Sequence, residues 1–394
     1  MLNTGCWIDT VFCLVFFQLN YVENNGQITF TNKMVKDKNK LNSTLAKAKE
    51  GGVLSKSDIT FLLNLEDSEQ IERLFQAACH LRRKHFGDEI FLYGFIYTST
   101  HCRNDCRFCF FRRSNPESPR YRKTTPEIVA TARRLADSGV HLIDLTMGED
   151  PALFNNSGVG FDRLIDLVES IRKATGLPIM VSPGLIPENI LGRLSEAGAC
   201  WYACYQETHQ RRLFNQLRPG QDYDLRLEIK LKAHNRGMLI EEGLLCGVGE
   251  TANDIAGSMA VMQELDADQV RVMNFVPQPG TPMVNRTPLD PQKELLISAV
   301  MRLVFPDRLI PASLDVDGLA GLKQRLEAGA NVVTSIVPPG RGLAGVARHS
   351  LDIEEGKRTI ASVNEILPAC GLRPAGAEKY LSWINRRRES ILLF

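Results

Sequence analysis

The sequence predicts an α/β protein built on a (β/α)8 TIM-type barrel, with a helical lead-in at its N-terminus. Two observations support this fold class. From residue 90 onward, eight apolar runs of strand length occur, and helix-like segments lie between most of them. A cluster of cysteines directly follows the first run, at the position where such barrels carry their active sites. A count of strands does not prove that the sheet closes, so a doubly wound sheet is the alternative.

The elements are expected in a simple order along the chain. Residues 41–89 form the helical lead-in, with helices starting at Ser57 and Ser68, because apolar residues then recur at helical spacing. Residues 90–394 form the barrel with C-terminal helices. The strands are expected at 91–98, 142–147, 178–183, 201–206, 240–246, 269–276, 308–315 and 331–337, and the helices at 125–138, 161–174, 186–197, 222–236, 251–265, 289–304 and 317–328.

The first 40 residues are expected to be a disordered extension outside the fold. Residues 7–19 are apolar, but this run is too short to span a bilayer, and Asp9 interrupts it. The run also lacks the basic region and cleavage site of a signal peptide. Met34 opens a more ordinary amphipathic beginning, which suggests that Met1 is an over-early start codon.

The composition limits the kinds of partner. The chain has 394 residues and a net charge of +1, and no block of Lys and Arg stands out. We therefore expect neither nucleic acid nor a membrane as a partner. Ten cysteines in a chain of this length do not indicate a disulfide scaffold. Clustered reduced thiols instead predict a metal site and a cytoplasmic protein.

Three cysteines, Cys102, Cys106 and Cys109, follow the first predicted strand with the spacing C-x3-C-x2-C. Three thiolates on one loop can hold three irons of a [4Fe-4S] cluster. No fourth cysteine lies nearby, so one iron would keep an open position. The alternative is a structural zinc ion, with His101 or a distant residue as the fourth ligand.

Charged residues also interrupt the apolar strands. Asp144 lies in the second predicted strand and Arg271 in the sixth, while Ser313 and Asp315 share one face of the seventh. Two carboxylates and one guanidinium complement a small zwitterion with two ammonium groups and one carboxylate, such as L-lysine. An internal Asp–Arg ion pair that only fills the barrel is an equally weighted alternative.

The cysteine loop resembles the signature of the radical S-adenosylmethionine (SAM) enzymes, with Phe108 as the aromatic residue before the last cysteine. More narrowly, residues 141–151, 205–208, 271–275, 309–315 and 329–335 resemble the methylornithine synthases of pyrrolysine biosynthesis, within the biotin-synthase-like branch. The resemblance implies a radical enzyme that isomerises L-lysine to (3R)-3-methyl-D-ornithine. It also implies a [4Fe-4S] cluster, SAM and a low-potential electron donor.

The resemblance implies roles for individual residues as well. The cluster ligands correspond to Cys102, Cys106 and Cys109, and the product contacts to Asp144, Arg271, Ser313 and Asp315. The residues expected on the cofactor side are Phe108, Phe110, Gly148, Glu149, Ser182, Tyr205, Glu207 and Arg226. By strand alternation Cys204 faces away from Glu207 and is expected to be a packed thiol.

Three rival functions remain at this stage. One is another reaction of the same branch, such as sulfur insertion or hydrogenase maturation. The second is a non-enzymatic iron–sulfur electron carrier, although carriers are usually small. The third is a zinc-bound structural or interaction protein.

Overall fold

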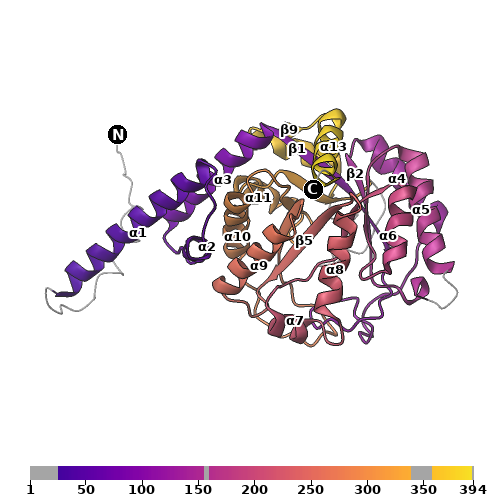
Figure 1. The fold of residues 1–394 in the computed structure, drawn as a ribbon, viewed down its shortest axis with the longest axis horizontal. Helices are drawn as coiled ribbons and strands as arrows, with labels where there is room; N and C mark the ends of the chain where they lie inside the picture. The colour runs from indigo at the N-terminus through magenta and orange to yellow at the C-terminus, as the bar shows by residue number, and fades with distance from the viewer. Residues whose placement is uncertain (1–24, 155–158, 339–356, 393–394) are drawn as a thin grey trace, which may run out of the picture. The chain divides into compact units, whose positions relative to one another are not determined.

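The computed structural model describes residues 25–154, 159–338 and 357–392. Its contacts divide the chain into a short N-terminal unit, residues 1–43, and a large unit, residues 44–394. The large unit contains the barrel (Figure 1). No helix within the described residues is long and apolar enough to cross a membrane.

The core of the large unit is a ring of parallel strands. The strands are β1 (Glu89–Ser99), β2 (Leu142–Met147), β3 (Ile179–Ser182), β4 (Ala199–Ala203), β5 (Leu239–Cys246), β6 (Gln269–Asn274), β7 (Pro311–Ser313) and β8 (Val332–Ile336). Their order is β6-β5-β4-β3-β2-β1-β8-β7. The ring is joined between β6 and the start of β7, where Val270 N donates to Leu309 O at 3.0 Å and Leu309 N donates to Asp268 O at 3.0 Å. The predicted barrel is confirmed, and a doubly wound sheet is excluded.

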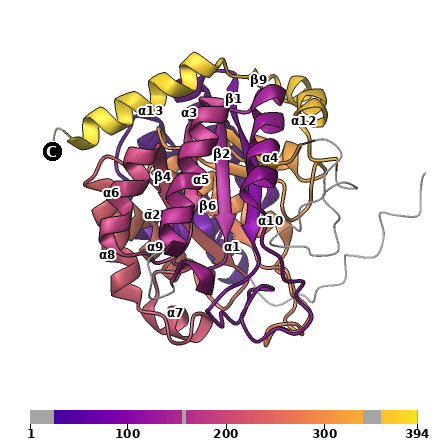
Figure 2. The ribbon, with the colours of Figure 1, turned by 90° about the vertical axis from the view of Figure 1, so that its right-hand side faces the viewer.

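Helices cover the outside of this ring (Figures 1 and 2). They are α4 (Thr125–Ser138), α5 (Val159–Thr175), α6 (Glu188–Ala197), α7 (Arg211–Leu217), α8 (Tyr223–His234), α9 (Ala252–Glu264), α10 (Pro291–Val304) and α11 (Leu322–Glu327). Side-chain caps fix several of their starts. Thr124 accepts from Glu127 N at the start of α4, and Thr251 accepts from Asp254 N at the start of α9.

The lead-in consists of α1 (Asn25–Lys49), α2 (Lys56–Leu63) and α3 (Ser68–Phe86). The N-cap of α2 is Ser55, two residues before the predicted start, while α3 begins at the predicted Ser68. Residues 1–24 of the expected extension lie outside the described residues, and residues 25–40 lie in α1. A boundary near residue 40 therefore stays a prediction.

The C-terminal segment comprises α12 (Ile360–Ile366), η2 (Leu367–Cys370), β9 (Arg373–Pro374) and α13 (Ala377–Leu392). Trp383 of α13 stacks on Trp201 of β4, with 6.0 Å between ring centroids, and the Tyr380 hydroxyl donates to the Tyr93 hydroxyl at 2.7 Å. These rings belong to one buried cluster at this end of the barrel. Figure 2 shows α13 at one end of the molecule and α7 at the other. One end of the barrel is therefore filled by side chains, which leaves the other for a site.

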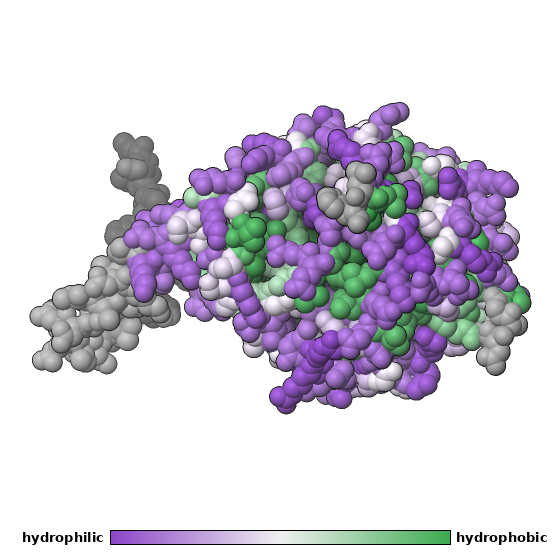
Figure 3. Space-filling view, viewed as in Figure 1, coloured by the Kyte–Doolittle hydropathy of each residue, from purple (hydrophilic) through white to green (hydrophobic). Residues whose placement is uncertain are grey.

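The surface gives no sign of a broad apolar interface on the side that faces the viewer in Figure 3. Hydrophilic residues predominate there, and apolar residues gather only in separate patches between them. Separate apolar patches of this kind are normal on the surface of a folded domain.

Candidate active site

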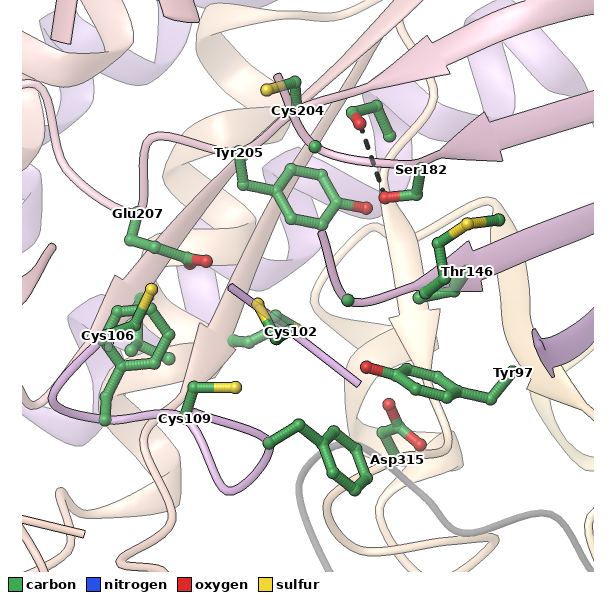
Figure 4. Close-up of a pocket in the computed structure, with 18 of the residues that line it drawn as sticks. Tyr97, Cys102, Cys106, Cys109, Thr146, Ser182, Cys204, Tyr205, Glu207 and Asp315 are labelled. Atoms are coloured by element: carbon green, nitrogen blue, oxygen red, sulfur yellow. Dashed lines mark hydrogen bonds between the residues drawn. The ribbon is translucent and has the colours of Figure 1, made fainter. Parts of the chain in front are cut away.

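A cavity of about 220 Å³ opens among the residues that end the strands or follow them. Most of the predicted site residues line it (Figure 4). These are Cys102, Cys106, Phe108, Cys109, Asp144, Gly148, Glu149, Ser182, Tyr205, Glu207, Arg226, Arg271 and Asp315. The pleat and the common direction of the strands explain why residues so far apart in sequence meet here.

Two of the predicted residues do not line this cavity. Phe110 packs in a buried cluster of aromatic rings beneath the cysteine loop, together with Phe95, Tyr97 and Phe111. The Ser313 hydroxyl lies 3.4 Å from the Ser335 hydroxyl. Ser335, and not Ser313, lines the cavity.

The cysteine loop lies against the end of β2, and Gly148 makes this approach possible. Arg103 N donates to Glu149 O at 2.9 Å, which ties the loop to the residue after the glycine. A Cβ at position 148 would collide with the His101 carbonyl oxygen and lie only 2.9 Å from Cβ of Cys102. The glycine therefore has a steric reason to be there, because no side chain fits between strand and loop.

The three thiols of the loop lie around one side of the cavity (Figure 4). Burial raises the pKa of the Cys102 and Cys109 thiols above the ordinary value, and neighbouring cysteines add to this effect. A bound metal cluster would offset that cost, because metal coordination deprotonates a thiol. Among the described residues, no three His, Cys, Asp or Glu side chains are grouped as ligands of one metal ion, an arrangement that a mononuclear zinc site requires.

Arg226 and Glu149 form a buried ion pair on the cofactor side. Nη1 of Arg226 lies 2.9 Å from Oε1 of Glu149, and its Nη2 donates to the Tyr205 carbonyl oxygen at 2.8 Å. Leu185 N donates to the same Glu149 oxygen at 3.0 Å. Burial by itself would raise the pKa of Glu149, but Arg226 and these hydrogen bonds hold it below its usual value. Arg226 is therefore buried and does not lie on a solvated helix surface.

Glu207 has a different partner. Its Oε1 lies 2.7 Å from Nη2 of Arg218, and its Oε2 is buried with no hydrogen-bond partner among the described residues. The backbone of Glu207 has φ of +67°, a left-handed conformation that is uncommon for glutamate. Burial raises the pKa of Glu207 although Arg218 acts in the opposite direction. Glu207 and Arg226 thus both face the cavity, but they do not pair with each other: Glu207 forms an ion pair with Arg218, and Arg226 forms one with Glu149.

Cys204 corrects one prediction. It was expected to face away from the site, yet it lines the cavity (Figure 4). The strand β4 ends at Ala203, one residue earlier, so the alternation of faces no longer applies at position 204.

The substrate side contains Asp144 and Arg271, but the two are not paired with each other. Asp144 Oδ1 accepts from the Thr146 hydroxyl at 2.9 Å. Burial, together with the negative charge of Glu241, raises the pKa of Asp144 to about 7. Nε of Arg271 lies 2.6 Å from Oε1 of Glu241, a fully buried carboxylate whose Oε2 accepts from the Tyr205 hydroxyl at 2.6 Å.

Asp315 also has a cationic partner. Nη1 of Arg358 lies 2.8 Å from its Oδ1 and donates to the Leu314 carbonyl oxygen at 3.0 Å. Both side chains are buried. The internal Asp–Arg pair considered as an alternative therefore exists for Asp315, but with Arg358 and not with Arg271.

Comparisons with known proteins agree with this geometry. Residues 96–261 match the Radical SAM superfamily. The chain is 44% identical to the 3-methylornithine synthase of Methanosarcina barkeri over 326 residues, which cover 83% of this chain and 92% of the relative. A crystal structure of methylornithine synthase superposes with a TM-score of 0.82 at 43% identity, covering 86% of this chain and 99% of that one. The chain belongs to the 3-methylornithine synthase family.

A weaker likeness extends beyond this family. A [FeFe] hydrogenase maturase subunit of Thermotoga maritima is 33% identical over 274 residues, which cover 69% of this chain and 77% of the relative. The chain is thus a radical SAM enzyme of the 3-methylornithine synthase family, and the electron-carrier and zinc-protein alternatives fall away. Membership of this superfamily implies a [4Fe-4S] cluster and SAM.

The residues of this family member fit those two groups. Three thiols share one side of the cavity, and a glycine leaves room for their loop. The Glu207 Oε2 atom, buried without a partner among the described residues, is available to a cationic group such as the amino end of SAM.

Four residues around the site of this methylornithine synthase relative were missed from the sequence. Glu241 could have been found, because it is a charged residue in an apolar strand, as Asp144 is. Arg218 and Gln221, which contact Cys106, and Arg358, which contacts Asp315, lie outside strands and carry no sequence pattern that marks them.

Proposed function

We propose that this chain isomerises L-lysine to (3R)-3-methyl-D-ornithine in the cytoplasm, as the first step of pyrrolysine biosynthesis, with a low-potential electron donor as its partner. One observation carries the proposal. A single cavity has three thiols on one side and, facing the same space, Asp144, Arg271 and Asp315. A radical source and a set of charges complementary to a diamino acid are thus placed together.

On the cofactor side, Cys102, Cys106 and Cys109 would hold three irons of the cluster, and Glu207 and Arg226 would hold the amino-acid end of SAM. When bound, the cluster and SAM supply a carbon-centred radical that can remove a hydrogen atom from an unactivated carbon. The chain's own task is to keep this end of the cavity closed to water and to other hydrogen donors.

On the substrate side, each charged side chain has atoms that can still bind a substrate. Nε of Arg271 faces Glu241, and its Nη1 makes only a long contact of 3.9 Å with the Met273 sulfur among the described residues, so the two terminal nitrogens can bind a carboxylate in a bidentate fork. Asp144 has a hydroxyl partner but no direct cationic one among the described residues, which suits it to an ammonium group. Asp315 would bind the second ammonium while Arg358 holds its other side.

Anchoring both ends of the substrate fits an isomerisation. Lysine and methylornithine are isomers, so one hydrogen atom must be returned to the carbon skeleton in place of the one that is removed. A skeleton that breaks and rejoins must not lose either piece, and charged anchors at both ends hold the pieces within reach of each other. The shape of the cavity then determines which carbon atoms of the two pieces lie close enough to form the new bond.

The proposal is tested by anaerobic incubation of the reconstituted enzyme with uniformly ¹³C-labelled L-lysine, SAM and dithionite. Chiral chromatography with mass detection should show a new amino acid of unchanged mass that keeps all labelled carbons. Cys109→Ala, treated in the same way, should give neither this product nor deoxyadenosine. Deoxyadenosine formed from SAM without any isomer of lysine would assign the chain to another reaction of the superfamily.

A further inference from the structure

The turn between α7 and α8 lies against the cysteine loop. Arg218 ends α7, and its carbonyl accepts from Gln221 N at 3.1 Å, which closes the turn before α8 begins. Arg107 N, within the cysteine loop, donates to the Leu217 carbonyl oxygen at 2.8 Å. The backbone of the loop is therefore fastened to this turn, and side chains of the turn reach the loop's thiols.

Two side-chain donors from the turn meet at one of the three sulfur atoms. Nε2 of Gln221 lies 3.0 Å from Sγ of Cys106, and Nη1 of Arg218 lies 3.5 Å from the same atom. Arg218 also donates to the Gln221 side-chain oxygen at 3.3 Å, so the two donors hold each other in place. Cys106 and Arg218 are both buried, which keeps water from competing for these contacts.

The charge at this sulfur has a direct consequence for a bound cluster. Reduction adds negative charge to a cluster and to its thiolate ligands. Hydrogen bonds and positive charge aimed at a ligand sulfur stabilise the reduced form and raise the reduction potential. Backbone N–H groups of Asn104 and Glu149 lie near the Cys102 sulfur, and that of Phe111 lies near the Cys109 sulfur. Cys106 receives a guanidinium and an amide from side chains.

The same guanidinium also reaches the cofactor side of the cavity. Nη2 of Arg218 lies 2.7 Å from Oε1 of Glu207, so one side chain joins a cluster sulfur to the carboxylate proposed for SAM. This pairing fixes Arg218 in place and leaves the second oxygen of Glu207 without a hydrogen-bond partner in the part of the chain that the structure describes. The orientation of the donor toward Cys106 is thus set by residues of the site itself.

We propose that Arg218 and Gln221 are positioning residues that raise the reduction potential of a cluster bound through Cys106, and so make its reduction by the electron donor easier. The inference rests on the proposed function, because it requires the cluster. It concerns two residues that act through a ligand and need not touch the substrate.

The test is an anaerobic redox titration of the reconstituted full-length protein, followed by the EPR signal of the reduced cluster. Gln221→Leu removes one donor at similar size, and Arg218→Gln removes the charge. In each variant the ratio of reduced to oxidised cluster at a fixed potential should fall about three- to tenfold, which is about 30–60 mV for a one-electron couple. Arg212→Gln is the matched control, since this exposed arginine lies on the same helix, and its titration should match the wild type.

Iron and sulfide analysis separates the outcomes. Wild-type protein that binds no cluster would overturn both the proposed function and this inference. Variants that bind four irons with an unchanged potential would overturn this inference alone. Arg218→Gln could fail to assemble a cluster because Glu207 loses its partner. In that case the redox titration of Gln221→Leu tests the inference alone, because Gln221 is half-exposed and uncharged, so its replacement leaves no buried charge unpaired.

Discussion

Arg271 on β6 and Glu241 on β5 form an ion pair inside the barrel, with 2.6 Å between Nε of the arginine and Oε1 of the glutamate. Glu241 is fully buried and also accepts from Tyr205 and Gln269, so it is held from three sides. Arg271 therefore has a structural partner on one edge of its guanidinium and an open edge for a substrate. The pair explains how a buried arginine can be stable before any substrate arrives.

A double substitution separates these two roles. Arg271→Met and Glu241→Gln should each destabilise the protein by about 3–5 kcal/mol, because each leaves a buried charge without its partner. The double variant should regain much of that loss, since neither charge remains, but it should still fail to bind lysine. Thermal unfolding and lysine binding measured on all three variants check this. Lysine affinity that returns together with stability would show that the arginine has only a structural role.

Asp144 predicts how lysine affinity depends on pH. Its pKa is about 7, so the carboxyl is ionised above that pH and protonated below it. Only the ionised form pairs with an ammonium group, and affinity should fall as pH drops below 7, by up to about tenfold per unit. Calorimetric titration with lysine between pH 5.5 and 8.5 measures this. Asp144→Asn should bind more weakly and lose the pH dependence over this range.

The same carboxyl should cost stability at high pH. Its pKa is raised in the folded protein, so the stability it contributes is present when it is protonated and is lost as pH rises through about 7. Replacing it with asparagine removes that penalty. The melting temperature of Asp144→Asn relative to the wild type should therefore increase between about pH 4.5 and pH 7, and the difference should level off above pH 7. A constant difference would mean that Asp144 does not titrate there.

The cysteine loop gives a further prediction. Cys102→Ala, Cys106→Ala and Cys109→Ala should each lose the visible absorbance of the cluster and all deoxyadenosine formation. Cys204→Ala should keep both, although Cys204 also lines the cavity, because it lies apart from the three thiols of the loop (Figure 4). Absorbance spectra after anaerobic reconstitution decide the matter. Loss of the cluster in Cys204→Ala would make that thiol a ligand.

The features that could be predicted from the sequence are those that depend on residues close together in the chain. The barrel and the cysteine loop follow from apolar periodicity and short spacing, which are properties of neighbouring residues. Asp144 and Arg271 were found because they interrupt apolar strands. Glu241 and Glu242 interrupt β5 in the same way, and the structure shows why both are tolerated: one pairs with Arg271 inside the barrel, the other with Lys230 of α8 outside it.

The contacts that were missed are made between distant segments. Arg218 contacts Glu207, and Arg358 contacts Asp315, only after the chain has folded. No spacing of these residues in the sequence predicts either ion pair. Cys204 was misplaced for a different reason. The alternation of side chains was applied from Cys204 to Glu207, beyond the end of β4 at Ala203, where the backbone is no longer extended strand. The end of a strand is both where catalytic residues gather and where periodicity stops being a guide.

The N-terminal region also yields a prediction. A chain that starts at Met34 keeps the second half of α1, including the buried Leu45 and Ala48. It should therefore have an unchanged melting temperature and form deoxyadenosine at the same rate as the full chain. Differential scanning calorimetry and product assays on both proteins check this. An insoluble or inactive shortened protein would show that residues before Met34 are needed by the barrel.

Asp315 and Arg358 allow the sharpest test of the substrate assignment. Asp315→Asn removes a charge from a proposed ammonium contact, so lysine affinity should fall about ten- to a hundredfold, as expected for a charge-assisted hydrogen bond of roughly 1.5–3 kcal/mol. The same change leaves Arg358 buried without its carboxylate, so the melting temperature should fall as well. Stability and binding therefore change together in this variant, and it cannot separate the two roles alone.

Arg358→Met is the matched control, because it breaks the same ion pair and keeps the carboxylate. It should lower the melting temperature in the same direction as Asp315→Asn. Lysine affinity should be kept or increased, because Asp315 then has no cation competing with the substrate's ammonium group. Lysine binding to Asp315→Asn that matches the wild type, or an equal loss of affinity in both variants, would reduce Asp315 to one half of a structural pair. Opposite effects of the two variants on affinity, with similar effects on stability, would place the ammonium group of the substrate at Asp315.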